Sequence, residues 1–303
     1  MMIPVTLCAV KLQDIEQDVF GIARDIYSKL FAKAINLITL NVTSSSEFGN
    51  LWNVVENINN YIFQPVALSL VVLFFLMGFC ATSTDVKQEL TFESVLKLFL
   101  KLSVTEALVY ESVPISKAII ETASRFTSAI VSYKNVNTVL PSLLTINDET
   151  YNMSATSRVF FVLITLIHLV IAVTCGAILV GSAYIRFFKV LTIFPFGTLA
   201  VSTIAGGGSQ TLANVFPSYL KYLTATVLET VGMAIGFYLA WAMTHSITGQ
   251  TDYFGLMTIA ASEKHLLNAC AKTAQLCISY VFSVFIVTTS KNVAGNALGL
   301  KYN

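Results

Sequence analysis

The sequence predicts an all-α membrane protein with five or six transmembrane helices and an amphipathic helix ahead of the first of them. The composition supports this class, because 12% of the 303 residues are charged and 55% are hydrophobic, whereas soluble domains carry about 25% charged residues. The 27 residues between Arg158 and Arg186 contain no charged residue apart from the ionisable His168, and the 31 residues of 190–220 contain none. Runs of this length can cross the hydrocarbon core of a bilayer as helices.

Residues 1–60 are predicted to form an N-terminal helix followed by a loop. Within residues 11–40, apolar side chains such as Ile15 and Val19 recur at helical spacing, and charged side chains occupy the other side. This pattern is typical of an amphipathic helix that lies on a membrane or packs on a partner protein. The alternative is that it packs against the protein's own helices. Residues 61–303 are predicted to form the transmembrane domain.

The first predicted span is Tyr61–Thr84, whose 24 residues carry no charge. The next segment, Phe92–Tyr110, is apolar but carries charged residues on one side of its helix, among them Lys101 and Glu106. It is therefore either a span that faces the interior of a helix bundle or a helix that lies at the interface. Residues 111–157 are more polar and predict an excursion, either an extramembrane helix with a loop or a re-entrant segment.

The centre of the chain is predicted to form a helical hairpin of two spans, residues 159–182 and 190–205. The short break between them holds Arg186 and Lys189 among aromatic residues. Cations and aromatic residues at the end of an apolar run mark a membrane interface. We therefore expect Arg186 and Lys189 to anchor the tip of the hairpin at the interface.

The second span of this hairpin contains one helix breaker and is followed by another. Pro195 removes a backbone hydrogen bond and, with Gly197, predicts a kink or a broken helix. The run Gly206, Gly207 and Gly208 then ends the helix. We expect Pro195 and these three glycines to act as a kink or hinge. A half-span followed by a return is the alternative to a kinked but complete span.

The fifth and sixth predicted spans are residues 220–243 and 274–290. Trp241 lies near one end of the fifth span, where its ring suits anchoring at the interface. The same span contains Gly232-Met-Ala-Ile-Gly236, a spacing that permits two helices to approach closely. We therefore expect Gly232 and Gly236 to lie at a helix–helix contact.

Two ionisable residues within the predicted spans are candidates for function. Glu229 lies near the middle of the fifth span, where a carboxylate costs several kcal/mol unless it faces a partner, the protein interior or water. It either lines an aqueous cavity or makes a structural hydrogen bond to a neighbouring helix. His168 lies in the third span and presents the same alternatives, since a lone histidine usually has one satisfied partner.

Several classes of function are disfavoured by what the sequence lacks. It contains no P-loop, dinucleotide-binding or metalloprotease motif, and its five cysteines form no CxxC. The sequence therefore predicts a protein that is not an enzyme and that holds no metal or cofactor. The net charge of +1 gives no case for a nucleic-acid-binding surface.

Residues 158–243 resemble the TrbL-like family, the polytopic inner-membrane subunits of type IV secretion and conjugation machines. A long apolar span ends in Arg186 and is followed by the segment FFKVLTIFPFGTLA, in which a proline lies in an apolar stretch after the basic residues. A linker of small residues comes next, and Pro217-Ser-Tyr-Leu-Lys221 leads into another apolar span. Tyr219 stands where family members commonly have a tryptophan.

This resemblance implies an oligomeric platform in the bacterial cytoplasmic membrane that works with ATPases and with pilus or stalk proteins. Such a subunit would support or line the route of the transferred DNA or protein. Glu229, with Lys101 and Glu106, would line a cavity, and Gly232 and Gly236 would pack helices. The alternative function is a stand-alone transporter or permease with a small-molecule site around His168 and Glu229.

Overall fold

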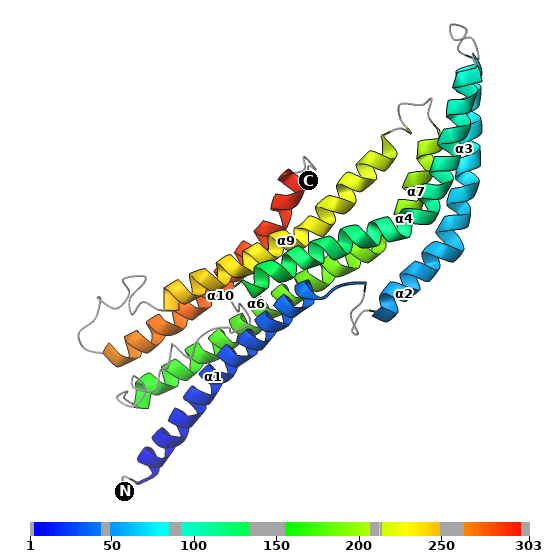
Figure 1. Ribbon diagram of the computed structural model, residues 1–303. Coiled ribbons are helices and arrows are strands. Elements are labelled where there is room, and N and C mark those ends of the chain that lie inside the picture. The colour runs from blue at the N-terminus through cyan, green and yellow to red at the C-terminus, as the bar shows by residue number, and fades with distance from the viewer. Residues whose placement is uncertain are drawn as a thin grey trace. The chain divides into compact units, whose positions relative to one another are not determined.

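The computed structural model describes residues 3–43, 49–84, 92–133, 155–206, 212, 214–248 and 264–297. These residues are helical apart from short turns, and no strand occurs among them. The all-α class is therefore confirmed (Figure 1). In chain order the elements are α1 (Ile3–Thr39), α2 (Gly49–Ile58), η1 (Asn59–Phe63), α3 (Gln64–Thr84), α4 (Phe92–Ser132), α6 (Ala155–Ile193), α7 (Phe196–Ser202), η2 (Thr203–Ala205), α9 (Val215–Thr248) and α10 (Lys264–Ala297).

Four helical stretches among the described residues are long and apolar enough to cross a membrane. They are Asn50–Cys80, Ser157–Ala205, Val215–Ser246 and His265–Ser290. These stretches support the membrane class that the composition predicts. Helix α4 is not among the four stretches, because its apolar residues alternate with too many charged ones.

The predicted central hairpin is wrong. Helix α6 is one continuous helix of 39 residues that passes through Arg186 and Lys189 without a turn. At about 1.5 Å per residue it is about 58 Å long, well beyond the roughly 30 Å of a hydrocarbon core. The basic pair does not end the helix, because both cations bond to helix α9 inside the protein.

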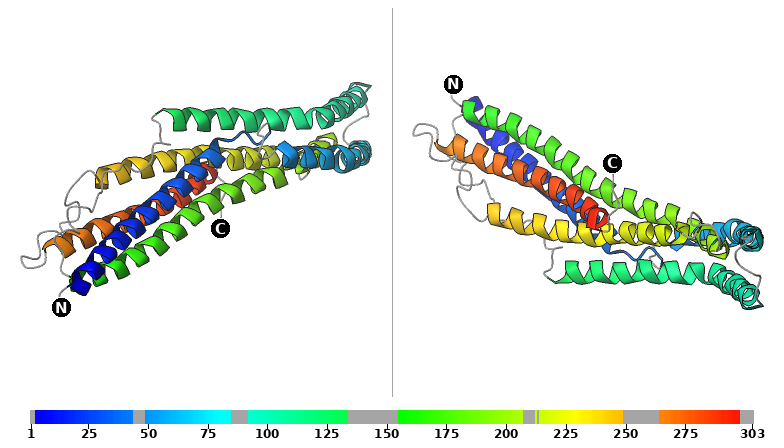
Figure 2. Two further views of the ribbon diagram at one scale, coloured as in Figure 1. Left: turned by 90° about the horizontal axis from the view of Figure 1, so that it is seen from below. Right: turned by 90° about the horizontal axis from the view of Figure 1, so that it is seen from above.

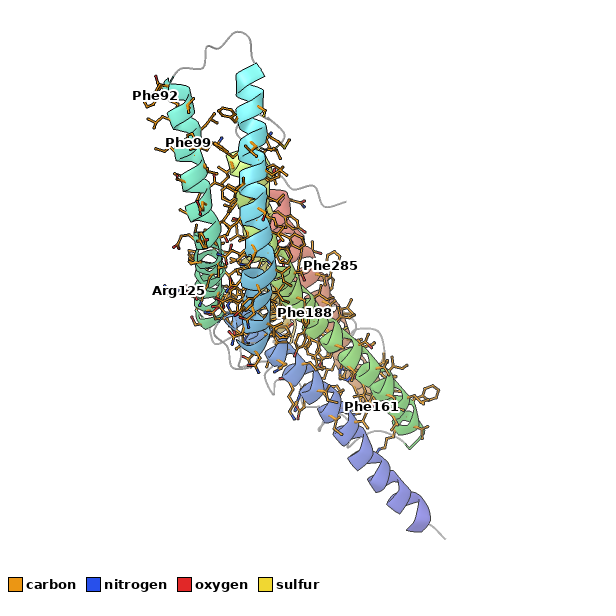
Figure 3. All side chains as sticks on the ribbon, turned by 90° about the vertical axis from the view of Figure 1, so that its right-hand side faces the viewer. Phe92, Phe99, Arg125, Phe161, Phe188 and Phe285 are labelled. Atoms are coloured by element: carbon orange, nitrogen blue, oxygen red, sulfur yellow. The ribbon has the colours of Figure 1, made fainter. Side chains whose placement is uncertain are left out.

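Helix α4 is a single 41-residue helix that continues from the predicted second apolar segment through Pro114 into the predicted excursion. Its buried side chains recur every three or four residues on both sides of that point, which gives the helix one continuous packing stripe. The helix also carries large exposed side chains, including those of Phe92 and Phe99 (Figure 3). Residues 134–154 of the predicted excursion lie outside the described residues.

The chain divides into two compact units, and neither is continuous in sequence. Unit 1 consists of residues 1–39, 128–184 and 232–291. It contains α1, the first part of α6, the last part of α9 and α10, which run side by side (Figure 2). Its core is rich in aromatic residues from all four helices, with Tyr27, Phe161, Phe237 and Tyr280 all nearly fully buried.

Unit 2 consists of residues 40–127, 185–231 and 292–303. Helix α3 packs against α7 and η2, and α4 lies beside α3 (Figure 1). Its core cluster is made of small and β-branched side chains, which let these helices approach closely. The cluster comprises Ala67, Val71, Val109, Val201 and Ala205.

Candidate functional site

Two cations at the end of α6 face helix α9 in unit 2. Arg186 and Lys189 are three residues apart and therefore lie on the same side of α6. The Lys189 Nζ donates a hydrogen bond to Glu229 Oε1 of α9 over 2.8 Å, and the side chains of these two residues are 29% and 8% exposed. Glu229 thus makes a bond to a neighbouring helix, which is one of the two alternatives that its sequence position leaves open.

Arg186 bonds to the same helix one turn away from Lys189. Its Nη2 donates to the carbonyl oxygens of Thr226 and Val227, each over 3.2 Å, and to the hydroxyl of Thr230. The side chain is 6% exposed, and the Glu229 carboxylate also acts on it electrostatically. A guanidinium is suited to this role because it is planar and presents several donors in a fixed geometry.

Together these residues form what we call the charged clasp: Arg186, Lys189, Thr226, Glu229 and Thr230. It holds two cations and one carboxylate, and the Lys189 ammonium also lies 5.8 Å from the ring centroid of Tyr222. A buried ion pair of this kind adds little net stability but strongly favours one register of the two helices, because shifting either helix would leave a charge without its partner.

A break in the helix follows the charged clasp. Helix α6 ends at Ile193, and α7 begins at Phe196 with Pro195 before it. Pro195 has no N–H to donate and its ring clashes with the preceding turn. The Gly197 N–H bonds instead to the Phe194 carbonyl over 3.1 Å. Pro195 thus lies where an α-helical run gives way to a short helix. Gly206 ends η2, whereas Gly207 and Gly208 lie outside the described residues.

The break is held on one side by residues from the start of the first apolar stretch. The rings of Trp52 and Phe194 have centroids 4.6 Å apart, and those of Phe63 and Phe196 are 5.5 Å apart. The Thr198 hydroxyl donates to Oδ1 of Asn59, which is 1% exposed. An apolar helix can bury Asn59 because its amide has this partner.

Asn59 begins η1, a π-helical turn in which the Gln64 N–H bonds to the Asn59 carbonyl. Pro65 comes directly after Gln64. Because proline has no backbone N–H to donate to the preceding turn, the wider π-helical hydrogen bonding occurs next to it. Single π-helical turns are frequent at functional sites. Two irregular helical segments, η1 and the break at Pro195, thus meet in unit 2.

On its other side the break is held by Tyr219 of α9. The Tyr219 hydroxyl donates to the Phe194 carbonyl over 3.4 Å. A Cβ at Gly197 would lie 2.6 Å from the Tyr219 hydroxyl oxygen, closer than real Cβ atoms approach. Glycine at position 197 therefore lets α9 pack directly on the break.

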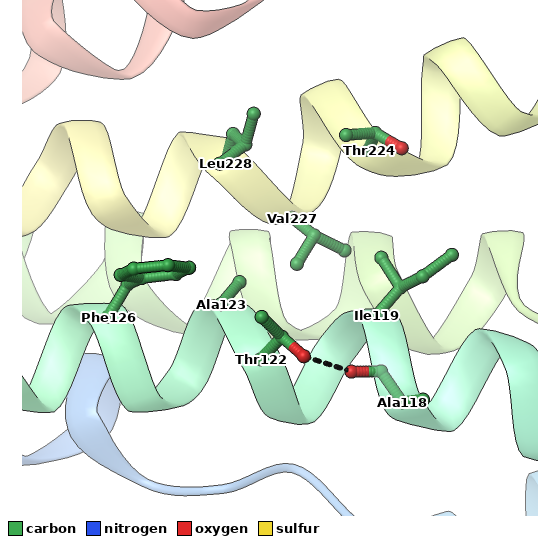
Figure 4. A pocket seen from close by; sticks show the side chains of 8 residues that line it. All are labelled: Ala118, Ile119, Thr122, Ala123, Phe126, Thr224, Val227 and Leu228. Atoms are coloured by element: carbon green, nitrogen blue, oxygen red, sulfur yellow. Dashed lines mark hydrogen bonds between the residues drawn. The ribbon is translucent and has the colours of Figure 1, made fainter.

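Unit 2 also contains a pocket of about 340 Å³ between α4 and α9 (Figure 4). Its lining is mostly apolar and comprises Ala118, Ile119, Thr122, Ala123, Phe126, Thr224, Val227 and Leu228. Neither Glu229 nor the two α4 residues predicted to line a cavity, Lys101 and Glu106, belongs to this lining. Lys101 is half-buried and Glu106 is exposed on α4.

The remaining predicted residues lie in unit 1. His168 is fully buried and stacks between Phe20 and Tyr280. The Trp241 ring stacks on His245 with centroids 5.6 Å apart. A Cβ at Gly232 would lie 2.8 Å from the backbone oxygen of Ser290. Glycine there permits the close approach of α9 to α10, as the GxxxG spacing predicts.

A second glycine of the same motif extends this contact. A Cβ at Gly236 would lie 3.2 Å from Cα of Val287, so both glycines face α10.

Several residues of the site are not predicted from the sequence. Trp52, Asn59 and Thr198 are such residues, since nothing local connects positions so far apart. One signal was present: Asn59 and Asn60 are polar residues at the start of an apolar stretch and shortly before Pro65, where a helix irregularity is expected.

Comparisons of the chain with family models, curated proteins and solved structures find no match. The function must therefore be inferred from the residues and contacts described above.

Proposed function

We propose that this chain is a multi-pass subunit of a type IV secretion or conjugation machine in the bacterial cytoplasmic membrane. In this role it works as an oligomer that supports or lines the path of the transferred DNA or protein. The observation that carries the proposal is the contact between two segments of the TrbL-like resemblance. Phe194 and Gly197 of the first segment pack against Tyr219 of the second.

The contact matters because the two segments are separated by a linker in the sequence. Arg186, at the end of the long apolar run, bonds to α9 as well. The basic residue, the proline-containing segment and the aromatic residue at the start of the next span thus form one packed structure within unit 2. Each of these sequence features alone is weak support for the proposed family. Their contact with one another in the structure makes the support stronger.

The proposal assigns a structural role to the charged clasp. Lys189 and Glu229 fix the register of α9 against the end of α6, and the helix break redirects the chain into α7. Glu106 and Lys101 on α4 are assigned to a face that meets water or a partner subunit. The subunit itself is not an enzyme, and partner ATPases supply the energy for transfer.

The stand-alone transporter requires a polar binding site formed with Glu229. Its carboxylate is bonded to Lys189, and the pocket described in unit 2 is mostly apolar. These observations favour the assembly subunit over the transporter.

The proposal is tested by deleting the gene in the native host and measuring cell-to-cell transfer of DNA or effector protein. We expect transfer to be lost and to return with the wild-type chain. Gly197→Val, which collides with Tyr219, is expected to reach the membrane in reduced amount or to restore transfer only weakly. Gly181→Val is the matched control, because a Cβ at Gly181 meets nothing within 4 Å. Unchanged transfer after deletion would refute the proposal.

A further inference from the structure

A column of four rings runs through the core of unit 1. His168 of α6 stacks on Phe20 of α1, with centroids 5.1 Å apart, and faces Tyr280 of α10 at 5.6 Å. Tyr280 in turn stacks on Tyr27 of α1 at 3.8 Å, with the ring planes 21° apart. Three of these four rings carry polar atoms, and the column connects three helices of the unit.

Three polar atoms of the column have no protein partner among the described residues. Both ring nitrogens of His168 and the hydroxyl of Tyr280 are buried without a hydrogen bond, and the Tyr27 hydroxyl faces Ser283. The three side chains are at most 1% exposed. A buried donor or acceptor that is left unsatisfied loses its hydration without compensation. Three such atoms within one aromatic column, on the neighbouring helices α6 and α10, indicate that something other than protein satisfies them.

A seam of hydroxyl groups lies next to the column on α9 and α10. Ser279 donates to the Thr244 hydroxyl over 2.7 Å, and the Ser283 hydroxyl lies 3.5 Å from the same oxygen. Ser283 also donates to the Ser279 carbonyl over 2.8 Å. Ser283 faces Tyr27, so the seam adjoins the phenols of the column. The seam offers further donors and acceptors to anything bound beside the column.

The groups of this site are suited to a small neutral molecule. Phenol, imidazole and aliphatic hydroxyl groups each donate and accept hydrogen bonds without carrying a full charge. Burial raises the pKa of Tyr27 above its ordinary value, which keeps that phenol protonated and able to donate. No group of three potential metal ligands occurs in the described part of the chain, so a metal ion is a poor match for this site.

We propose that the ring column is a hydration site that binds water between His168, Tyr280 and Tyr27 and connects it to the Ser283 hydroxyl. Buried water of this kind makes two to four hydrogen bonds to polar groups that otherwise have no partner. It keeps the His168 ring in proton exchange with water although the side chain is fully buried.

The first test is the thermal stability of a phenylalanine variant, because the sign of its change in Tm distinguishes a site that holds water from one that does not. Tyr280→Phe keeps the ring stack and removes only the hydroxyl. If water satisfies the hydroxyl, Tm of the full chain in detergent falls. If the site is dry, Tm rises, because an unsatisfied polar group has been deleted. Tyr61→Phe is the matched control, since Tyr61 is 80% exposed and lies outside the column.

The second test measures water at the imidazole in the unaltered protein. The full chain is labelled with ¹⁵N-histidine, reconstituted in lipid bilayers and studied by water-edited solid-state NMR. The three histidines are assigned by substituting His245 and His265 in turn. We expect magnetisation to pass from water to the His168 ring nearly as fast as to the exposed His265. A His168 ring that receives none, or a raised Tm for Tyr280→Phe, would overturn the proposal.

Discussion

The two units differ in how some of their buried polar side chains are bonded. In unit 2, the polar groups of Glu229, Arg186 and Asn59 are bonded to other protein groups. In unit 1, the polar side-chain atoms of His168 and Tyr280 have no protein partner among the described residues. Both units bury these groups within largely apolar helices, where each polar group needs a partner.

The difference indicates what the polar groups do. A polar group whose partner lies on another helix fixes the register of the two helices, since a shift would separate the pair. A polar group without a protein partner is available to a ligand. We therefore expect substitutions in the charged clasp of unit 2 to cause large losses of stability. In unit 1, we expect the effect of a substitution on stability to depend on whether it disturbs close helix packing or bound water.

The largest effect is expected for Lys189→Met, which removes the cation that is hydrogen-bonded to the buried Glu229 carboxylate. Removing one member of a buried ion pair costs about 3–5 kcal/mol, and we expect a loss at the lower end because Lys189 is 29% exposed. Thermal or denaturant unfolding in detergent measures it. The double variant Lys189→Met, Glu229→Leu should recover most of the loss, and a double variant as unstable as the single one would show that the pair is not coupled.

The next effect is expected for Arg186→Lys, which keeps the charge but loses the guanidinium geometry. An ammonium group cannot reach the Thr226 and Val227 carbonyls and the Thr230 hydroxyl from one planar group. Hydrogen bonds to charged groups contribute about 1.5–3 kcal/mol, and we expect a loss of unfolding free energy in this range. Wild-type stability in this variant would mean that charge alone, rather than geometry, is needed at this position.

In unit 1, Gly232→Ala tests whether stability depends on close backbone packing. The added methyl would collide with the backbone oxygen of Ser290, and overpacking costs about 1–3 kcal/mol. Gly181→Ala is the matched control: nothing lies near its Cβ, and alanine favours a helix over glycine by about 1 kcal/mol. The two variants should therefore shift Tm in opposite directions, and a shift of the same sign would contradict the close contact of α9 with α10.

The smallest effect is expected for Thr198→Val in unit 2. This change keeps the shape of the side chain but removes its hydrogen bond to Asn59, at a cost of about 1 kcal/mol. Asn59→Ala should cost a similar amount, and the double variant should cost less than the sum of the two. Additive losses would show that the two residues do not interact.

The local features of the fold could be predicted from the sequence. The all-α class and the apolar stretches follow from composition and run length. The effect of Pro195 follows from proline chemistry, which acts within one helical turn. The close approach at Gly232 follows from glycine spacing. These features depend on residues that are neighbours in the chain.

The errors concern residues whose partners are distant in the chain. The sequence predicts Arg186 and Lys189 at an interface, because cations and aromatic residues at the end of an apolar run mark one. The partner of Lys189 is Glu229, 40 positions later, and the sequence alone does not show that the two meet. The stacking of His168 on Tyr280 could not be predicted for the same reason.

The most direct test of the proposed function is to extract the native protein in a mild detergent, size it, and identify every protein that co-purifies with it. We expect a large assembly that contains several copies of this chain together with secretion ATPases and pilus or stalk proteins. A lone monomer or dimer without these partners would contradict the account, and the stand-alone transporter would become the better explanation.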